Sequence, residues 1–435
     1  MPTRTKHRQP PNRMPQQAVP PVHVTPAPAR RHHKLMVLLP ILATIAIFTP
    51  ISYIWAKTGD FGAHHEFAFM MILDQEQRII TPHCLYHILF LASWFAARFI
   101  LPFVIPGLVE DSFAHWAMSV QPASTFTLLL FLVLQVIIVY YLLFNILLTQ
   151  TSRVKAWIIA SLLSVALMVA SPLNFIFPLD GKHYFGYIVF TVFHNPTFIV
   201  LKPLGLLFFL LILKLLQAEN RFNLRLMASA FALTVVSILA KPSYAICAVP
   251  VFGLYTIPMM IRGHWRLFTM IALGIFLPVA LSLGWQYSLT YTGNAESKII
   301  WAPLAAISAH SSWLLVKYLL SILFPAAVYL AFFSRARRDF ALNLSWLIFL
   351  LGSFYTYFLA ESGERFYHGN LGWGTLECLF ILFVFSVIFL LKNRADIRQT
   401  PKMRFAYRTC WVLFFLHICN GILWYREQYF NNSLA

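Results

Sequence analysis

Long apolar segments alternate with short polar stretches along almost the whole chain. Most of them reach the roughly 17–25 residues that a helix needs to cross a bilayer. No stretch between them is long enough for a soluble domain of useful size. The pattern therefore predicts an all-α polytopic transmembrane helical bundle with about 11–13 spans. The segments lie near residues 36–56, 83–104, 125–149, 156–172, 196–216, 226–240, 243–262, 267–288, 312–333, 340–359, 372–391 and 406–424.

The composition agrees with a chain that packs inside lipid. Hydrophobic residues make up 59% and charged residues only 11% of the 435 positions, whereas soluble domains carry about 25% charged residues. The five cysteines (Cys84, Cys247, Cys378, Cys410 and Cys419) are scattered, mostly in apolar runs, and lack metal-site spacing. Buried thiols are the expected reading.

The basic residues gather in short loops between the later apolar segments. The net charge is +18, from 33 Lys and Arg against 15 Asp and Glu. The loops with Arg221, with Arg262, with Arg335 to Arg338 and with Lys392 to Arg404 alternate with poorly basic loops. By the positive-inside rule the former are cytoplasmic, and the loops at Lys241, Glu296 and Glu361–Asn370 are external. Anionic membrane lipids are thus the expected partner of the positive charge, and nucleic acid is not.

Residues 1–34 differ from the rest, being rich in proline, basic and free of Asp and Glu. Such a segment cannot bury enough apolar area to fold, so we expect a disordered cytoplasmic tail. A transmembrane domain over residues 35–425 and a short C-terminal tail over 426–435 complete the expected organisation. The protein should be a multi-pass integral protein of the plasma or inner membrane with a cytoplasmic N-terminus.

The first third of the chain presents a parity problem. Three apolar segments separate the tail from Arg153 and Lys155, although two cytoplasmic positions require an even number of spans. Either residues 83–120 form a hairpin or re-entrant element, or Arg153 and Lys155 are external. Pro102, Pro106 and Gly107 interrupt the run, which favours a broken or re-entrant element.

Candidate chemistry begins in the first external loop, Lys57 to Glu66. Asp60 and His64 stand four residues apart and would share one helix face. A carboxylate beside an imidazole can take a proton from a hydroxyl. A solvated loop without function is the alternative.

Two later loops add histidines and a helix start. His83 and His87 are also four residues apart, but a zinc site needs further ligands, so hydrogen-bonding histidines are the favoured reading. His194 precedes Asn195-Pro196, a turn that predicts a helix beginning at Pro196. A ligand role for Asn195 beyond this cap is the less favoured reading.

Two further clusters stand on the same predicted external face. Lys241 interrupts an apolar run beside Tyr244, and a basic residue there calls for a compensating anion such as a phosphate. The segment from Glu361 to Gly374 holds Arg365, which can clamp an oxyanion, followed by His368 and Trp373. Trp373 can stack on a sugar ring or anchor at the interface, and Arg365 can pair with Glu361 or Glu364.

This constellation resembles the GT-C superfamily of multi-span glycosyltransferases, which use polyprenyl-phosphate sugars. Asp60 in Gly59-Asp60-Phe61-x-x-His64 matches the catalytic acidic residue that this superfamily carries just after its first span. The opening Pro82-x-x-Leu85-Tyr86-His87 and the later external Lys241 are also similar. The odd number of segments before Arg153 departs from the superfamily pattern.

The resemblance implies an inverting transfer of sugar from a polyprenyl-phosphate donor to a glycan, lipid or protein acceptor. Asp60 would be the base, and Lys241, with Arg365, would hold the donor phosphate. His64, His87, His194, Asn195, Tyr244, His368 and Trp373 would complete the substrate site. No cofactor follows with certainty, and a divalent cation stays an open alternative. A transporter or flippase of a lipid-linked or anionic substrate is the alternative function; it would call for internal repeats and mid-span charges. A polymerase or ligase with large external loops is a third possibility.

Overall fold

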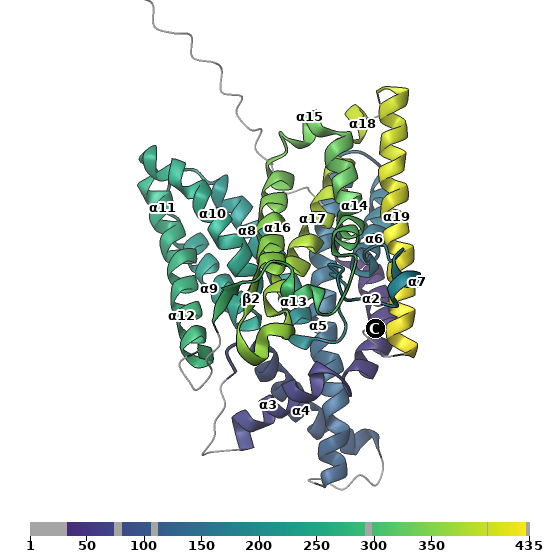
Figure 1. The fold of residues 1–435 in the computed structure, drawn as a ribbon, viewed down its shortest axis with the longest axis vertical. Helices are drawn as coiled ribbons and strands as arrows, with labels where there is room; N and C mark the ends of the chain where they lie inside the picture. The colour runs from purple at the N-terminus through teal and green to yellow at the C-terminus, as the bar shows by residue number, and fades with distance from the viewer. Residues whose placement is uncertain (1–32, 74–80, 106–111, 292–297, 398, 432–435) are drawn as a thin grey trace, which may run out of the picture.

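The computed structural model describes residues 33–73, 81–105, 112–291, 298–397 and 399–431. It is an almost wholly helical bundle, as the sequence predicts, with one two-stranded sheet (Figure 1). Within these residues ten helices are long and apolar enough to span a membrane. The chain is therefore a multi-pass membrane protein.

The helices that run between the two ends of the bundle are mostly those the apolar segments predict. They are α2 (Leu38–Trp55), α5 (Phe113–Leu148), α6 (Arg153–Val169), α8 (Pro196–Leu216), α9 (Leu224–Ala240), α10 (Ser243–Ile261), α11 (Trp265–Ile271) continued by the π-helical turn η1 (Ala272–Phe276) into α12 (Leu277–Tyr291), α14 (Leu314–Ala331), α16 (Phe340–Phe358), α17 (Trp373–Lys392) and α19 (Pro401–Phe430). Helix α17 is the most enclosed of them, with 94% of its apolar window buried.

The remaining elements lie at the ends or edges of the bundle. They are α1 (His33–Met36), α3 (Asp60–Leu73), α4 (Leu85–Val104), α7 (Phe177–Asp180), β1 (Ile299–Trp301), α13 (Ala305–Ser308), α15 (Phe333–Ala336), β2 (Leu359–Glu361), the 3₁₀ turns η2 (Gly363–His368) and η3 (Asn370–Gly372), and α18 (Arg394–Ile397). Strands β1 and β2 are antiparallel, with Ile299 opposite Glu361.

One end of the bundle, the basic face, collects the loops that the sequence assigns to the cytoplasm (Figure 1, top). Trp157 Nε1 donates to Met36 O at 2.7 Å, and Gln150 Nε2 donates to Leu391 O at 2.9 Å. Lys392 Nζ lies 3.9 Å from Asp339 Oδ2. The starts of α2, α6 and α16 and the ends of α5 and α17 therefore share this face.

The opposite end, the cavity face, collects α3, residues 170–195, residues 241–242 and the segments around β1 and β2. Asn195 Nδ2 donates to Asp60 Oδ2 at 2.8 Å, and Lys298 N donates to Ser362 Oγ at 2.8 Å. Loops far apart in sequence thus meet at one end.

Helix α4 resolves the parity problem, because it stays at the cavity face. Trp94 Nε1 donates to Trp116 O at 3.3 Å, and the His115 ring nitrogen Nε2 lies 2.8 Å from Arg98 O, so α4 packs on the first turns of α5. Gln121 Nε2, in the same part of α5, donates to Tyr53 O near the end of α2. Helix α4 is continuous through Pro102, and Pro106 and Gly107 lie outside the described residues. Of the described segments before Arg153, only α2 and α5 therefore link the two faces.

A non-helical segment passes through the bundle between α6 and α8. Residues 187–195 are all buried, so their backbone groups need partners within the protein. Lys202 Nζ donates to Phe190 O at 2.8 Å, Trp424 Nε1 donates to Thr191 O at 2.9 Å, and Ile188 N donates to Ser321 Oγ at 3.0 Å. Side chains from three helices thus replace the hydrogen bonds that a helix would supply.

Helix α19 continues to Phe430, past the expected boundary of the transmembrane domain at residue 425. Its last turns are tied to the bundle, since Tyr425 Oη donates to Ile47 O at 2.6 Å and Gln428 is buried. Packing against α2 and the buried segment therefore keeps the helix ordered past the last long apolar run.

The two faces predict an accessibility pattern. Single cysteines replacing the exposed Glu364 and Arg338 should react with a membrane-impermeant maleimide from opposite sides of sealed vesicles, because the bundle lies between them. The tail before Lys34 should be accessible from the Arg338 side. A variant without the five native cysteines is the background, and labelling of both positions from one side would contradict the topology.

Candidate functional site

Asp60 is the first residue of α3, directly after the turn that ends α2, and its side chain is exposed at the cavity face. Its Oδ2 accepts a hydrogen bond from Asn195 Nδ2. Asn195 is the N-cap of α8, as its sequence predicts, because its Oδ1 accepts from Phe198 N at 2.9 Å. The cap therefore leaves the amide nitrogen of Asn195 to orient the carboxylate of Asp60.

Lys241 contacts Asn195 and Thr197 and completes this group of polar side chains. Its Nζ donates to Thr197 Oγ1 at 3.0 Å and to Asn195 Oδ1 at 3.5 Å, and it lies 4.6 Å from the centre of the Trp373 ring. Burial lowers the pKa of Lys241 to about 8, although the negative charge of Asp60 opposes this. Lys241 thus fixes the side chain of Asn195, and its charge interacts with the Asp60 carboxylate. Lys241 is not among the described residues that line the cavity.

His194 sits in a cage of aromatic rings. Its ring centre lies 5.1 Å from that of Tyr184 and 5.8 Å from those of Trp55 and Trp373. Burial lowers its pKa to about 4, against the opposing charge of Asp60. Among the described residues no hydrogen-bond partner meets its buried Nδ1. His194 is therefore a neutral imidazole at the cavity edge.

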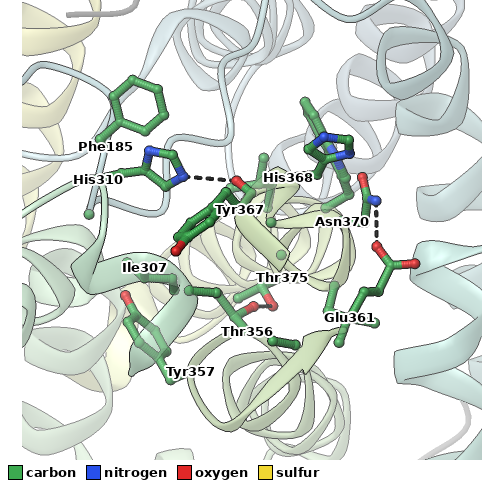
Figure 2. Close-up of a pocket in the computed structure, with 18 of the residues that line it drawn as sticks. Phe185, Ile307, His310, Thr356, Tyr357, Glu361, Tyr367, His368, Asn370 and Thr375 are labelled. Atoms are coloured by element: carbon green, nitrogen blue, oxygen red, sulfur yellow. Dashed lines mark hydrogen bonds between the residues drawn. The ribbon is translucent and has the colours of Figure 1, made fainter. Parts of the chain in front are cut away.

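A cavity of about 280 Å³ opens beside this group (Figure 2). Its walls come from the buried segment, the α13 region, the end of α16 and the η2–η3 turns. Asp60 and Glu361 are the carboxylates, and Arg365 is the one Lys or Arg, among the described lining residues. Aromatic side chains form much of the remaining wall: Tyr184, Phe185, Tyr187, Tyr357, Phe366, Tyr367 and Trp373.

The wall formed by β2, η2 and η3 carries a second group of polar side chains, separate from Asp60 and His194. Asn370 Nδ2 donates to Glu361 Oε2 at 2.6 Å, and Arg365 Nη1 lies 3.8 Å from Glu361 Oε1. Glu361 is buried, with 6% of its side chain exposed, whereas Arg365 is 37% exposed. Glu361 therefore orients the amide and the guanidinium on this wall.

A histidine cluster packs at the junction of α3 and α4. His64 Nδ1 lies 3.0 Å from His87 Nε2, and His87 Nδ1 lies 3.1 Å from Thr81 Oγ1. The expected pairing of Asp60 with His64 is thus replaced by Asp60–Asn195 and His64–His87. Over the described ranges no three His, Cys, Asp or Glu side chains could hold a metal ion.

Burial keeps His64, His65 and His83 neutral. It lowers the pKa of His64 to about 2, with smaller contributions from His87 and Lys241. It lowers the pKa of His83 to about 3 and that of His65 to about 4.

The structure brings some of the predicted site residues together and separates others. Asp60, His194, Arg365, His368 and Trp373 line the cavity, with Asn195 and Lys241 directly behind. His64 and His87 belong to the histidine cluster and are not lining residues. Tyr244 was expected at the site, but it is fully buried in α10 and packs on Phe208. Tyr244 lies three residues after Lys241, and at that position in α10 its side chain points into the core.

Three further residues belong to the site through contacts made in the tertiary structure. Thr197 accepts a hydrogen bond from Lys241, and the Tyr184 ring packs on that of His194. The buried Lys317 donates to Asp180, to Ser311 Oγ at 2.6 Å and to Phe185 O at 3.1 Å. A lysine inside an apolar run was the available signal for Lys317.

Comparison with known proteins adds no relative. No protein-family model matches the chain, and a search of curated proteins finds no similar sequence.

The neutral histidines predict acid sensitivity. In the unfolded chain His64, His65, His83 and His194 take up protons near pH 6.5, whereas the folded protein holds their pKa values at about 2 to 4. Their contribution to stability is therefore complete above pH 6.5 and is lost as the pH falls, by about 1.4 kcal/mol per pH unit for each. The unfolding temperature in detergent should fall steadily from pH 7 to pH 4.5.

His64→Gln should reduce this slope, because one such group is removed, while His264→Gln on the basic face should leave it unchanged. Intrinsic fluorescence melting curves measure both. An unfolding temperature that is constant or rises towards pH 4.5 would contradict the expectation.

Proposed function

We propose that the chain is a membrane glycosyltransferase of the GT-C type, which transfers a sugar from a polyprenyl-phosphate donor to an acceptor at the cavity face. The observation that carries the proposal is the placement of Asp60: an exposed carboxylate on a cavity wall, oriented by Asn195, with Lys241 behind it. By the positive-inside rule, the excess of Arg and Lys on the opposite face supports a cytoplasmic position for that face, so the reaction would occur on the external side.

In this proposal Asp60 takes the proton of an acceptor hydroxyl. The hydroxyl oxygen attacks the anomeric carbon as the carbon–oxygen bond to the lipid phosphate breaks. The electron pair of that bond leaves with the phosphate, and the anomeric configuration inverts. Asp60 is suited to this role because a hydrogen bond from Asn195 fixes one carboxylate oxygen and leaves the other for the substrate.

Arg365 is the cation best placed for the donor phosphate. It is partly exposed on the cavity wall and can clamp two phosphate oxygens. Lys241 already donates to Thr197 and Asn195 and is buried. We therefore assign Lys241 to the positioning of Asp60, instead of the phosphate contact that its sequence position suggests.

The base assignment has a direct test. Asp60→Asn can keep the contact with Asn195 but loses the basic oxygen, so the transfer rate should fall about 10²–10⁴-fold while expression and donor binding stay near normal. The measurement is transfer of radiolabelled sugar from a panel of polyprenyl-phosphate hexoses by protein in nanodiscs. Mass spectrometry of cellular glycolipids and surface glycans, with and without the protein, identifies the product class.

Glu66→Gln is the matched control, because Glu66 is an exposed carboxylate on the same helix outside the cavity lining. It should keep most of the activity. Turnover by Asp60→Asn at the wild-type rate would remove Asp60 as the base.

Arg365 and Lys241 should differ in their kinetic signatures. Arg365→Ala should raise KM for the donor about tenfold, since a charge-assisted contact to the phosphate is lost, and saturating donor should rescue the rate. Lys241→Met should instead lower kcat about 10- to 100-fold with little change in KM, because Asn195 no longer fixes Asp60. If a high donor concentration restores the rate of Lys241→Met, then Lys241 contacts the donor phosphate and the positioning role is wrong.

Transport of a lipid-linked or anionic substrate is the second candidate, and one buried pair favours it. Lys202 in α8 and Glu377 in α17 are enclosed within the bundle, and no hydrogen bond reaches either Glu377 oxygen from the described residues. Ionisable groups inside a membrane protein often mark a transport path. Substrate uptake that persists in Asp60→Asn and is lost in Glu377→Gln would favour transport.

A further inference from the structure

Tyr367 lies beside His310 on the cavity wall, as Figure 2 shows. The residue is 58% exposed although it lines the cavity wall. Its backbone oxygen lies 2.8 Å from His310 Nε2, and the His310 ring is perpendicular to the tyrosine ring at 6.2 Å. Phe185 stacks on His310 at 5.2 Å. The Tyr367 ring is thus accessible to solvent, and the contact with His310 holds the backbone that carries it.

Polar groups with fixed geometry lie on the same wall. The Glu361 carboxylate is bonded to the Asn370 amide, with His368 beside them (Figure 2). The carboxylate accepts and the amide donates, so together they suit the paired hydroxyl groups of a sugar. A lipid acceptor would be better served by a continuous apolar wall.

An aromatic face and such a polar pair in one cavity favour a particular class of ligand. The C–H groups on one face of a pyranose ring carry partial positive charge, and the face of an aromatic ring is negative. The hydroxyl groups at the edge of the pyranose need directional partners, which Glu361 and Asn370 provide. A glycan with neutral pyranose rings satisfies both features.

We infer that Tyr367, with Glu361 and Asn370, forms the acceptor subsite, and that the acceptor is a glycan that places a neutral pyranose ring on the Tyr367 face. The inference rests on the proposed function, since it assigns the acceptor of that reaction. The exposed side of Tyr367 receives a ligand from the aqueous phase, whereas a lipid-linked donor arrives from the membrane.

Binding without donor tests the subsite independently of transfer. Wild-type protein in nanodiscs is titrated with methyl hexopyranosides and disaccharides, and binding is followed by saturation-transfer difference NMR. At least one glycoside should bind. Tyr367→Ala should weaken its binding about tenfold, whereas Tyr367→Phe should match the wild type because it keeps the ring face.

Two further variants keep the test decisive. Tyr367→Leu keeps apolar bulk without an aromatic face and should behave like Tyr367→Ala if the latter proves unstable. Tyr287→Ala changes another exposed tyrosine, 62% accessible on α12 and outside the cavity lining, and should bind like the wild type.

The outcomes separate the inference from the proposed function. If no glycoside binds the wild type, or if Tyr367→Ala and Tyr367→Leu bind as well as it does, the subsite is refuted. In transfer assays Tyr367→Ala should raise KM for the acceptor. A rise in KM for the donor instead also refutes the subsite. If glycosides bind through Tyr367 but no polyprenyl-phosphate hexose is consumed, the transferase proposal fails and the sugar subsite stands.

Discussion

The arrangement of the cavity face depends on how an extended backbone is satisfied inside an apolar bundle. Residues 187–195 cannot use helical hydrogen bonds, and an unpaired peptide group in such surroundings costs several kcal/mol. Three buried lysines hold the chain at successive points. Lys317 Nζ donates to Phe185 O and Lys202 Nζ donates to Phe190 O. Lys241 Nζ donates to the side-chain oxygens of Asn195 and Thr197. Each comes from a different part of the chain, so the segment fixes the relative positions of several helices.

The candidate site is a consequence of that segment. Its end becomes the N-cap of α8, and the cap residue Asn195 reaches Asp60 across 135 positions of sequence. The residues just before it, Tyr184 and Phe185, contribute to the cavity wall. The lysines that bind this part of the chain thus position the aromatic wall and the carboxylate. A change in any of them would affect stability and the site together, which is why kinetic and structural readouts must be separated.

Basic side chains differ in their exposure to solvent between the basic face and the rest of the bundle. On the basic face the arginines are mostly exposed, where anionic headgroups can reach them, whereas Lys202 inside the bundle and Lys241 and Lys317 near the cavity face are buried. These three lysines therefore do not oppose the positive-inside pattern. Their charges are used within the protein, against Asp60, Asp180 and backbone oxygens.

The sequence alone determined the helical class, most helix positions, the cap at Asn195 and the two-faced distribution of charge, because each depends on local hydropathy or local hydrogen bonding. It also singled out Asp60, His194, Arg365 and Trp373, since polar residues between apolar segments are conspicuous. Only the tertiary structure decided that α4 stays at one face, that His64 pairs with His87, that Tyr244 turns into the core and that Lys241 lies behind Asn195. Those outcomes depend on which helices become neighbours and on the direction of each side chain within its turn, and local sequence patterns do not encode either.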